Sequence, residues 1–493
     1  MKKLILGLLG ALVIVAAIAV VRAATLSSAQ VPVEPATDLL AVDANAAAAR
    51  LAGSLRFPTV SFLPPEPVDT AAFLGLHDYL EGSYPGVHAT LRREVVNHLS
   101  LLYTWEGSDP QAAPGVLMGH LDVVPVIPGT EDDWTHGAFE GVVADGRIWG
   151  RGAMDDKSSV VGILEAVEAL IAEGYRPRRT LYLAFGHDEE VGGPLGAGAM
   201  ADTVARRSPE LAVVLDEGGA VIRDVVPGLP GPVALVGVAE KGFLSALLRV
   251  EGIGGHSSVP PATTTVGILS QAIRELEENP FPLHLDGPAQ SMMEMVAAEA
   301  SFGVRLALGN LWLTRPLVTR MIAASPEGAA MLRTTTAATM FDAGVKDNVL
   351  PITAEAVVNF RIRPGETVES TLARVRDVID DPRVEVTQLY EGGGQDPSPV
   401  SRTDGEAYRH LARTIRESLG TEDVPVIPYL VVGGTDAKYY SGRSPNVFRF
   451  LPVDFGEAGT EAIHGTDERI PVEGFAGAVR FFHRFIRGLD RLD

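Results

Sequence analysis

The sequence predicts an α/β protein with a mostly parallel sheet and an inserted domain of α+β type. Apolar runs with strand character alternate with amphipathic helical runs over residues 67–237, and the alternation returns over 394–493. This order requires crossover connections between parallel strands. Residues 238–393 have a different character, and we expect them to form the inserted domain. With 493 residues, the chain is long enough for two cores.

The N-terminal segment, residues 1–30, is expected to be a signal peptide or a membrane anchor. Two lysines precede 18 uncharged, almost wholly apolar residues at 4–21, an order that is typical of export signals. The stretch is long for a cleaved signal and short for a membrane span. Small residues would permit cleavage after Ala29, whereas Arg22 could close a retained anchor. Both alternatives place the body outside the cytoplasm, as a periplasmic or secreted protein.

Residues 31–66 are rich in Ala and Pro and are expected to tether this segment to the α/β domain. Within that domain, three predicted strands begin near residues 115, 180 and 211, and an amphipathic helix is predicted over 158–175. Each of the three strands ends in acidic residues or histidine. Because ligands of parallel sheets gather at the carboxyl ends of strands, these side chains are candidate site residues.

The inserted domain is predicted from a strand that begins at 243 and a second strand at 355–365, which is followed by a helix over 367–380. The stretch between the two strands, about 280–345, is apolar, contains methionine and has a helical pattern. We expect this stretch to elaborate the inserted domain.

The amino-acid composition limits both the classes of binding partner and the types of metal ligand that are possible. The chain is 46% hydrophobic and 21% charged, with a net charge of −22. This charge repels phosphates, which argues against nucleic acid or an anionic membrane surface as the principal partner. Membrane contact is therefore expected through the N-terminal segment alone. The chain has no cysteine, so a metal site must use His, Asp and Glu, as hydrolytic zinc sites do.

An acidic cluster follows the second of the three predicted strands. In the stretch FGHDEEVGG, Asp188, Glu189 and Glu190 are consecutive. Neighbouring carboxylates repel one another and lose hydration when buried, and a bound cation is the simplest compensation. His120 and Asp122 are two residues apart and face the same side of an extended segment. There the carboxylate could orient a metal-bound imidazole.

Further candidate ligands lie in three other parts of the sequence. Asp155 and Asp156 precede a predicted helix, whose N-terminus favours carboxylates. Asp216 and Glu217 end the third predicted strand, and His464 lies near the C-terminus. Together with the first cluster, these side chains suffice for two metal ions that share one carboxylate. One glutamate would then be left as a general base.

A series of motifs, in this order, resembles the dizinc metallopeptidase family of aminoacylase, glutamate carboxypeptidase and succinyl-diaminopimelate desuccinylase. Over roughly residues 40–493, the chain is most similar to the branch of carboxypeptidase S and the N-fatty-acyl-amino-acid hydrolases. The resemblance implies a zinc-peptidase catalytic domain with an inserted lid and dimerisation domain. The motifs are GHLDVVP, GRGAMDDK, FGHDEEVGG, VLDEGG, GGHSSVP, NVLP, RIRPG, GGTDAKYY and IHGTDE.

The resemblance also implies the metal ligands. Asp155 would bridge two Zn²⁺ ions, for which cobalt or manganese could substitute. The acid that completes the first site is Asp216 by similarity to this branch, or Glu217 by similarity to other relatives. The implied ligands are His120, Asp155, Glu190, Asp216 and His464.

Three catalytic roles follow from the resemblance. Asp122 would orient His120, and Glu189 would be the catalytic base. His256 would stabilise the oxyanion of the tetrahedral intermediate. In dimeric relatives this histidine often comes from the partner subunit, so a homodimer is expected to be possible here.

Four residues are implied as substrate contacts. Asn348 and Arg361 match polar positions that touch the substrate, and Arg361 could clamp a terminal carboxylate with two hydrogen bonds. Gly433 and Gly434 match a loop that presents backbone N–H groups to the same carboxylate. For Arg361, pairing with a neighbouring strand residue is the structural alternative.

These inferences predict an exported, zinc-dependent hydrolase that cleaves an amide bond next to a free carboxylate, in peptides or N-acyl amino acids. Two alternatives stay open, namely an aminopeptidase- or dipeptidase-type metallohydrolase that recognises a free amine, and a non-catalytic zinc-dependent binding protein. A further hypothesis is that the apolar stretch 280–345 accommodates a fatty acyl chain. The alternative explanation for that stretch is core packing within the lid.

Overall fold

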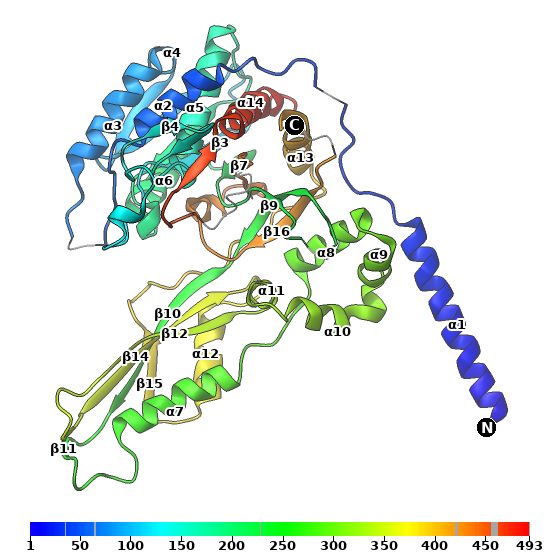
Figure 1. The fold of residues 1–493 in the computed structure, drawn as a ribbon, viewed down its shortest axis with the longest axis vertical. Helices are drawn as coiled ribbons and strands as arrows, with labels where there is room; N and C mark the ends of the chain where they lie inside the picture. The colour runs from blue at the N-terminus through cyan, green and yellow to red at the C-terminus, as the bar shows by residue number, and fades with distance from the viewer. Residues whose placement is uncertain (35, 64–65, 227, 420–422, 455–461, 493) are drawn as a thin grey trace.

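The computed structural model describes the whole chain except residues 35, 64–65, 227, 420–422, 455–461 and 493. A body built on a large sheet carries an elongated inserted domain, and an N-terminal helix projects from the body (Figure 1). The predicted α/β fold with an inserted α+β domain therefore agrees with the observed architecture.

The large sheet has nine strands in the described part of the chain, in the order β1-β2-β6-β3-β7-β17-β9-β16, with β8 paired to β9. Its centre, β6-β3-β7-β17, is parallel, as is the pair β9 and β16, whereas β1 and β2 are antiparallel additions. The strands are β1 (Arg92–Val96), β2 (Ser100–Trp105), β3 (Gly115–His120), β6 (Leu181–Gly186), β7 (Val213–Asp216), β8 (Val221–Arg223), β9 (Pro232–Glu240), β16 (Val426–Val431) and β17 (Val447–Arg449).

Helices cover both faces of this sheet, and this explains why its central strands are apolar on both sides. Leu117 and Leu183 face one core with helices α2, α5 and α14. Met118 and Ala184, the next residues along, face another core with α6 and the short turn η4. The elements of these layers are α2 (Ala44–Ser54), α3 (Thr70–Ser83), α4 (Pro85–Thr90), α5 (Lys157–Ala172), α6 (Ala199–Arg207), α13 (Glu406–Ser418), η4 (Asp436–Tyr440) and α14 (Val472–Leu489).

Short elements border the carboxyl edge of the sheet. A three-stranded sheet of order β18-β5-β4 lies beside it. Its strands and the remaining turns are β4 (Val142–Ala144), β5 (Arg147–Trp149), β18 (Arg469–Pro471), η1 (Glu131–Asp133), η2 (Glu189–Val191) and η3 (Pro194–Gly198).

The predicted tether over 31–66 differs from the structure, because helix α2 lies within it. Ala47, Ala48 and Leu51 of this helix are fully buried against the main core. Asp43 caps the helix by accepting a hydrogen bond from the backbone N–H of Ala46. The alanines that resemble a linker in composition instead permit close packing of α2 against its neighbours.

The inserted domain is an antiparallel sheet of order β12-β14-β10-β15 with α7 and α12 on one face. Strand β10 alternates between buried and half-buried residues, as expected for a sheet with one covered face. A two-stranded ribbon of β11 and β13 forms the far tip (Figure 1). The elements are β10 (Gly242–Glu251), β11 (Gly255–His256), α7 (Thr265–Glu278), β12 (Thr335–Ala343), β13 (Val349–Leu350), β14 (Thr353–Ile362), α12 (Val368–Ile379) and β15 (Val384–Gln388).

A four-helix segment, residues 287–332, interrupts the inserted domain in sequence but packs elsewhere. It was expected to elaborate that domain, yet Met292 and Met293 share a core with Val233 of β9 and Ile427 of β16. The segment therefore extends the body at the edge of the large sheet. Its helices are α8 (Gly287–Glu299), α9 (Phe302–Leu308), α10 (Leu311–Ile322) and α11 (Pro326–Leu332).

Helix α1 (Lys2–Thr25) projects from the body next to α9 (Figure 1). An 18-residue window of this helix has a mean hydropathy of 3.1, and only 6% of the window is buried, so by length and composition the helix could cross a membrane. The chain after it lies along the body. There the side chain of Gln30 donates to the carbonyl of Val426 and accepts from its N–H, at 3.2 and 2.8 Å.

Candidate active site

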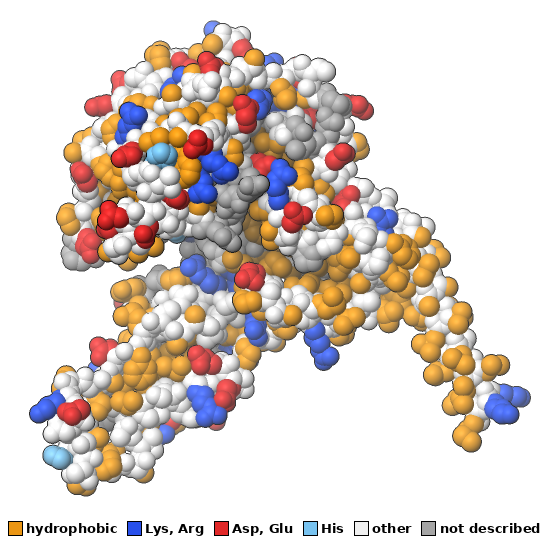
Figure 2. Space-filling model, in the orientation of Figure 1, with side chains coloured by type: hydrophobic (Ala, Val, Ile, Leu, Met, Phe, Trp, Pro, Cys, Tyr) orange, Lys and Arg blue, Asp and Glu red, His pale blue; other side chains and the backbone are white. Residues whose placement is uncertain are grey.

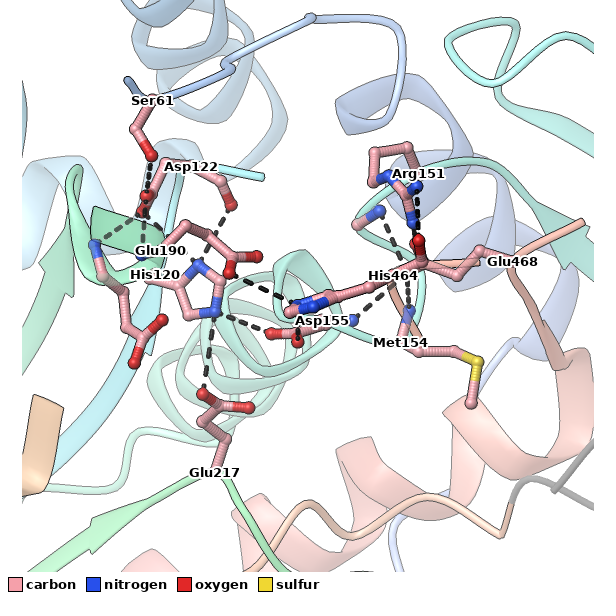
Figure 3. A network of polar contacts seen from close by, with 12 residues as sticks. Ser61, His120, Asp122, Arg151, Met154, Asp155, Glu190, Glu217, His464 and Glu468 are labelled. Atoms are coloured by element: carbon pink, nitrogen blue, oxygen red, sulfur yellow. Dashed lines mark hydrogen bonds and ion pairs between the residues drawn. The ribbon is translucent and has the colours of Figure 1, made fainter. Parts of the chain in front are cut away.

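Histidines and carboxylates gather at the carboxyl ends of β3, β6 and β7, where the sequence predicts a site (Figure 3). His120 is the last residue of β3, and Glu190 lies in the turn η2 that follows β6. Glu217 follows β7, Asp155 precedes α5, and His464 precedes β18. Residues from five separate parts of the chain therefore meet at one edge of the sheet.

Asp155 is at the centre of this group. One of its carboxylate oxygens lies 2.8 Å from Nε2 of His120, and the other lies 3.1 Å from Nε2 of His464. Glu190 is 3.3 Å from the same nitrogen of His464, and Glu217 is 3.7 Å from Nε2 of His120. The carboxylate of Asp155 thus stands between two half-sites, each with one histidine and one further glutamate.

Asp122 fixes both His120 and the turn η2. The ring nitrogen Nδ1 of His120 lies 3.0 Å from the carbonyl of Asp122 and 3.4 Å from its carboxylate. That carboxylate also accepts hydrogen bonds from the N–H groups of Glu189 and Glu190, at 3.2 and 3.1 Å. The hydroxyl of Ser61 donates a fourth contact at 2.6 Å. Asp122 therefore contacts both the ring of His120 and the backbone of the turn η2.

The structure brings Glu217, and not Asp216, to the group around Asp155. Consecutive residues at the end of a strand point to opposite faces of the sheet. Asp216 points toward η4 and accepts a hydrogen bond from the N–H of Ala437 at 2.7 Å. Glu217 points the other way and forms a potential metal-binding group with His120 and Asp156. Of the two acids that the sequence left open, the geometry favours the second.

Burial and repulsion between neighbouring carboxylates are the main causes of the pKa shifts of the glutamates at this site. Burial holds the pKa values of Glu189 and Glu217 well above their usual range, and the charge of Asp155 raises both further. For Asp155 itself burial acts in the same direction, but hydrogen bonds to His120 and His464 lower its pKa below the usual value. Hydrogen bonds to Asp155 and to Glu190 raise the pKa of His464 to about 10.

The donor atoms fit divalent cations. Both carboxylate oxygens of Asp156 and Oε1 of Glu190 are buried without a hydrogen-bond partner among the described residues. Such groups are costly to bury unless a cation compensates them. The available ligand atoms are imidazole nitrogens and carboxylate oxygens, which suit zinc and also admit cobalt or manganese.

A buried ion pair behind the site was missed by the sequence reasoning. Arg151 donates to Glu468 at 2.7 Å and to the carbonyl of His464 at 3.3 Å. Glu468 also accepts from the N–H groups of Gly152, Met154 and Asp155, at 3.0, 2.7 and 3.2 Å (Figure 3). The pair holds the loop of Asp155 against the segment of His464. Both residues lie inside motifs quoted above, GRGAMDDK and IHGTDE, and this is the signal that could have revealed them.

Two of the predicted residues lie far from this group within the chain. His256, which belongs to β11, and Asn348, which precedes β13, are exposed at the tip of the inserted domain (Figure 1). The N–H of Ser258 donates to Nδ1 of His256 at 3.1 Å, and the carbonyl of Asn348 accepts from the N–H of Ser257. A single chain does not bring either side chain to Asp155.

The other predicted substrate contacts lie closer to the body. Arg361, near the end of β14, places its guanidinium 5.0 Å from the ring centre of Phe243, and burial lowers its pKa. Gly433 and Gly434 lie in the loop between β16 and η4, with open space where a side chain would be. That loop leads to Asp436, whose buried carboxylate raises the pKa values of Tyr439 and Tyr440 beyond the effect of their burial.

Comparison with known proteins identifies the class. The family model described as Peptidase family M20/M25/M40 matches residues 116–488. The chain therefore belongs to this family of metallopeptidases and amidohydrolases, as the motifs predict, and it is an enzyme of that class.

The relatives agree with the branch expected from the motifs. The N-fatty-acyl-amino acid synthase/hydrolase PM20D1 of Mus musculus is 39% identical over 445 residues, which are 89% of this chain and 87% of the relative. The probable carboxypeptidase S-like 2 of Dictyostelium discoideum is 38% identical over 90% of this chain and 85% of its own length.

Solved structures support the fold. The M20 family metallo-carboxypeptidase Sso-CP2 from Sulfolobus solfataricus superposes with a TM-score of 0.63 at 16% identity, over 90% of this chain and 98% of that chain. Human carnosine dipeptidase 1 superposes with a TM-score of 0.61 over 91% of this chain and 97% of that chain. At 16% identity, these structures show a shared fold alone.

Proposed function

We propose that this enzyme hydrolyses an amide bond next to a free carboxylate and that it uses two zinc ions. The observation that supports this proposal most directly is the position of Asp155, between two histidines that each have their own glutamate. When bound, a pair of divalent ions polarises a carbonyl and lowers the pKa of a water molecule. The proposed ligands are His120, Asp155, Glu190, Glu217 and His464, with Glu217 in place of the Asp216 expected from the sequence.

Glu189 is the proposed general base. Its N–H is held by Asp122 at 3.2 Å, while its carboxylate has no hydrogen-bond partner among the described residues. The side chain is half-buried, so a substrate can reach it, and burial raises its pKa. Glu189 takes a proton from the attacking water and transfers it to the leaving nitrogen. No covalent bond between enzyme and substrate is needed.

The free carboxylate of the substrate is assigned to Arg361, Gly433 and Gly434. The guanidinium of Arg361 is half-buried, and burial strengthens an ion pair with a carboxylate. Gly433 and Gly434 offer backbone N–H groups in a loop without side-chain obstruction. For His256 and Asn348 we propose that a second copy of the chain supplies them, because both lie at the exposed tip of the inserted domain.

The proposed substrates are N-acyl amino acids and peptides cleaved at their C-terminus. These are the substrate classes in the names of the relatives at 38 to 39% identity. We also propose that the body of the enzyme lies outside the cytoplasm, because basic residues precede the apolar helix α1.

The variant Glu189→Gln tests this assignment. It should lose roughly 10²- to 10⁴-fold in kcat, the usual contribution of general acid–base catalysis, while elemental analysis still finds two zinc ions per chain. Substantial turnover in this variant would refute the role of Glu189. Rates on N-blocked and C-blocked peptides test the specificity, since faster cleavage of C-blocked peptides would favour an aminopeptidase.

A further inference from the structure

Helix α10 has an apolar face that points to solvent. Its exposed positions are 312, 313, 316, 317, 320 and 321, which recur with the period of a helix and therefore form one face. We call the apolar side chains of this face, together with Phe302 of the preceding helix, the α10 face. Their exposed fractions are 52% for Phe302, 53% for Trp312, 50% for Leu313, 59% for Leu317 and 68% for Met321.

The opposite face of α10 is already buried. Leu311 and Val318 belong to the core that the four-helix segment shares with β9 and β16. The helix is therefore apolar on both sides, a pattern that is typical of a helix covered all round. The indole N–H of Trp312 donates to Asn310 at 3.1 Å, so the exposed ring needs no further polar partner. The α10 face is thus suited to an apolar environment.

The α10 face adjoins the helix that could cross a membrane. The side-chain amide of Asn310 is buried and donates to the carbonyl of Ala19, near the end of α1, at 3.0 Å. Ala19 and Ala23 are the buried residues of α1. Figure 2 shows apolar atoms continuing from this region of the body onto α1. If α1 spans a bilayer, its C-terminal end lies at the bilayer surface, and the start of α10 lies there with it.

The local charge also suits a membrane surface. Residues 301–333 contain four arginines and one glutamate, a net charge of +3 in a chain with a net charge of −22. Arg320 is exposed within the face, between Leu317 and Met321. Apolar and aromatic side chains flanked by arginine are typical of segments that lie in the interface of a bilayer with anionic lipids.

We propose that the α10 face docks on the surface of an anionic lipid bilayer, beside α1. This departs from the expectation that only the N-terminal segment touches the membrane, because the charge of residues 301–333 is opposite in sign to that of the whole chain. The bilayer would bury the four-helix segment on its outer side, as the large sheet does on its inner side. The docked protein would carry its active site at a fixed distance from the lipid.

Docking would also bring the enzyme to substrates that lie in the bilayer, and this consequence rests on the proposed function. Tyr429 of β16 packs against the core of the four-helix segment, and its hydroxyl donates to the carbonyl of Gly218, next to Glu217. Tyr429 therefore connects the core of the four-helix segment with the loop that carries Glu217. Lipid-tailed N-acyl amino acids partition into bilayers, so docking would place the enzyme where such substrates concentrate.

Bromolipid quenching of tryptophan fluorescence tests the docking directly. The full-length protein is reconstituted into vesicles of phosphatidylcholine and phosphatidylglycerol, with and without brominated acyl chains. The chain has four tryptophans, and Trp105 and Trp134 are buried in the body. We expect brominated lipid to quench a component of the emission that Trp312→Phe lacks. Equal quenching of the two proteins would overturn the proposal, whether or not α1 is inserted and whether or not the enzyme is active.

A second experiment distinguishes docking of the α10 face on a bilayer from docking on another copy of the chain. The variant Leu313→Ser, Leu317→Ser, Met321→Ser should lose several-fold in rate on N-oleoyl amino acids in vesicles, with no change on soluble N-acetyl amino acids. Its control carries the same substitutions at three exposed apolar sites elsewhere on the body, Leu74, Val95 and Ile127, and should match the wild type on both substrates. An oligomer in lipid-free buffer that the first variant disperses would show that a second copy covers the face, and would overturn the proposal.

Discussion

Replacement of Glu468 by glutamine gives a sharp test of how the site is held together. Glu468 is fully buried, and Arg151 is 1% exposed. Glutamine keeps the oxygen that accepts the N–H groups of Gly152, Met154 and Asp155, which all lie within 3.2 Å of Oε1. It replaces Oε2, the oxygen that faces Arg151, by an NH2 group that cannot accept a hydrogen bond. The substitution therefore removes the ion pair and leaves the three backbone contacts.

The expected cost follows from the burial of the pair. Removing one partner of a buried ion pair leaves an uncompensated charge and costs about 3 to 5 kcal/mol. The loops that carry Asp155 and His464 also lose their common support, and loss of such a support lowers metal affinity by about 10- to 100-fold. Glu468→Gln should thus lower both stability and zinc affinity.

The assay is urea unfolding at pH 7 followed by circular dichroism, with zinc affinity measured against a competing chelator. The matched control is Glu94→Gln. Glu94 likewise pairs with an arginine and accepts two hydrogen bonds from Arg207, both at 2.7 Å, but this pair is partly exposed. Its loss should cost less than about 1 kcal/mol. Equal unfolding free energies for the two variants would refute the role that we give to the buried pair.

Three further predictions concern the ligands, the dimer and the inserted domain. Glu217→Gln should lose one zinc ion and most activity, whereas Asp216→Asn should keep both ions. Equal mixtures of His256→Ala and Glu189→Gln, each inactive alone, should recover about a quarter of wild-type activity after subunit exchange, because one site of each mixed dimer is intact. Lys241 should make stability rise with pH, since burial lowers its pKa to about 7. Above pH 7 the unfolded chain binds the extra proton, so stability should increase by about 1 kcal/mol per pH unit up to pH 10 relative to Lys241→Met.

Each of these predictions has a result that would contradict it. If Glu217→Gln bound two zinc ions and Asp216→Asn bound only one, the metal ligand would be Asp216, as expected from the sequence. Mixtures without recovered activity would show that His256 does not act across a dimer. The exposed Lys346 is the control for the pH series, because Lys346→Met should leave the pH dependence unchanged. A wild-type profile that parallels Lys241→Met would refute the effect of burial.

The strand ends could be predicted from the sequence because their residues carry chemistry that burial alone does not explain. Four such polar residues stand at the ends of apolar runs or inside family motifs, and the structure brings them together, namely His120, Asp155, Glu190 and His464. The sequence does not decide which of the two acids, Asp216 or Glu217, faces the site. The two side chains point to opposite faces of the sheet, and the sequence does not show where the alternation of strand β7 ends.

Features that depend on tertiary packing were also beyond sequence reasoning. Ser61 donates to Asp122, but a serine in a segment that resembles a linker gives no local signal of this contact. The alanines of α2 look like a tether until their helix is packed against α5 and α14. The four-helix segment has the periodicity of helices, but nothing in that periodicity tells which of two domains its inner face will cover.

The central claim is that two metal ions share Asp155, and anomalous diffraction from crystals of the zinc-loaded enzyme at the zinc absorption edge tests it most directly. We predict two peaks on either side of this carboxylate, one beside His120 and Glu217 and the other beside Glu190 and His464. A single peak, or zinc bound away from Asp155 in catalytically active crystals, would contradict the claim.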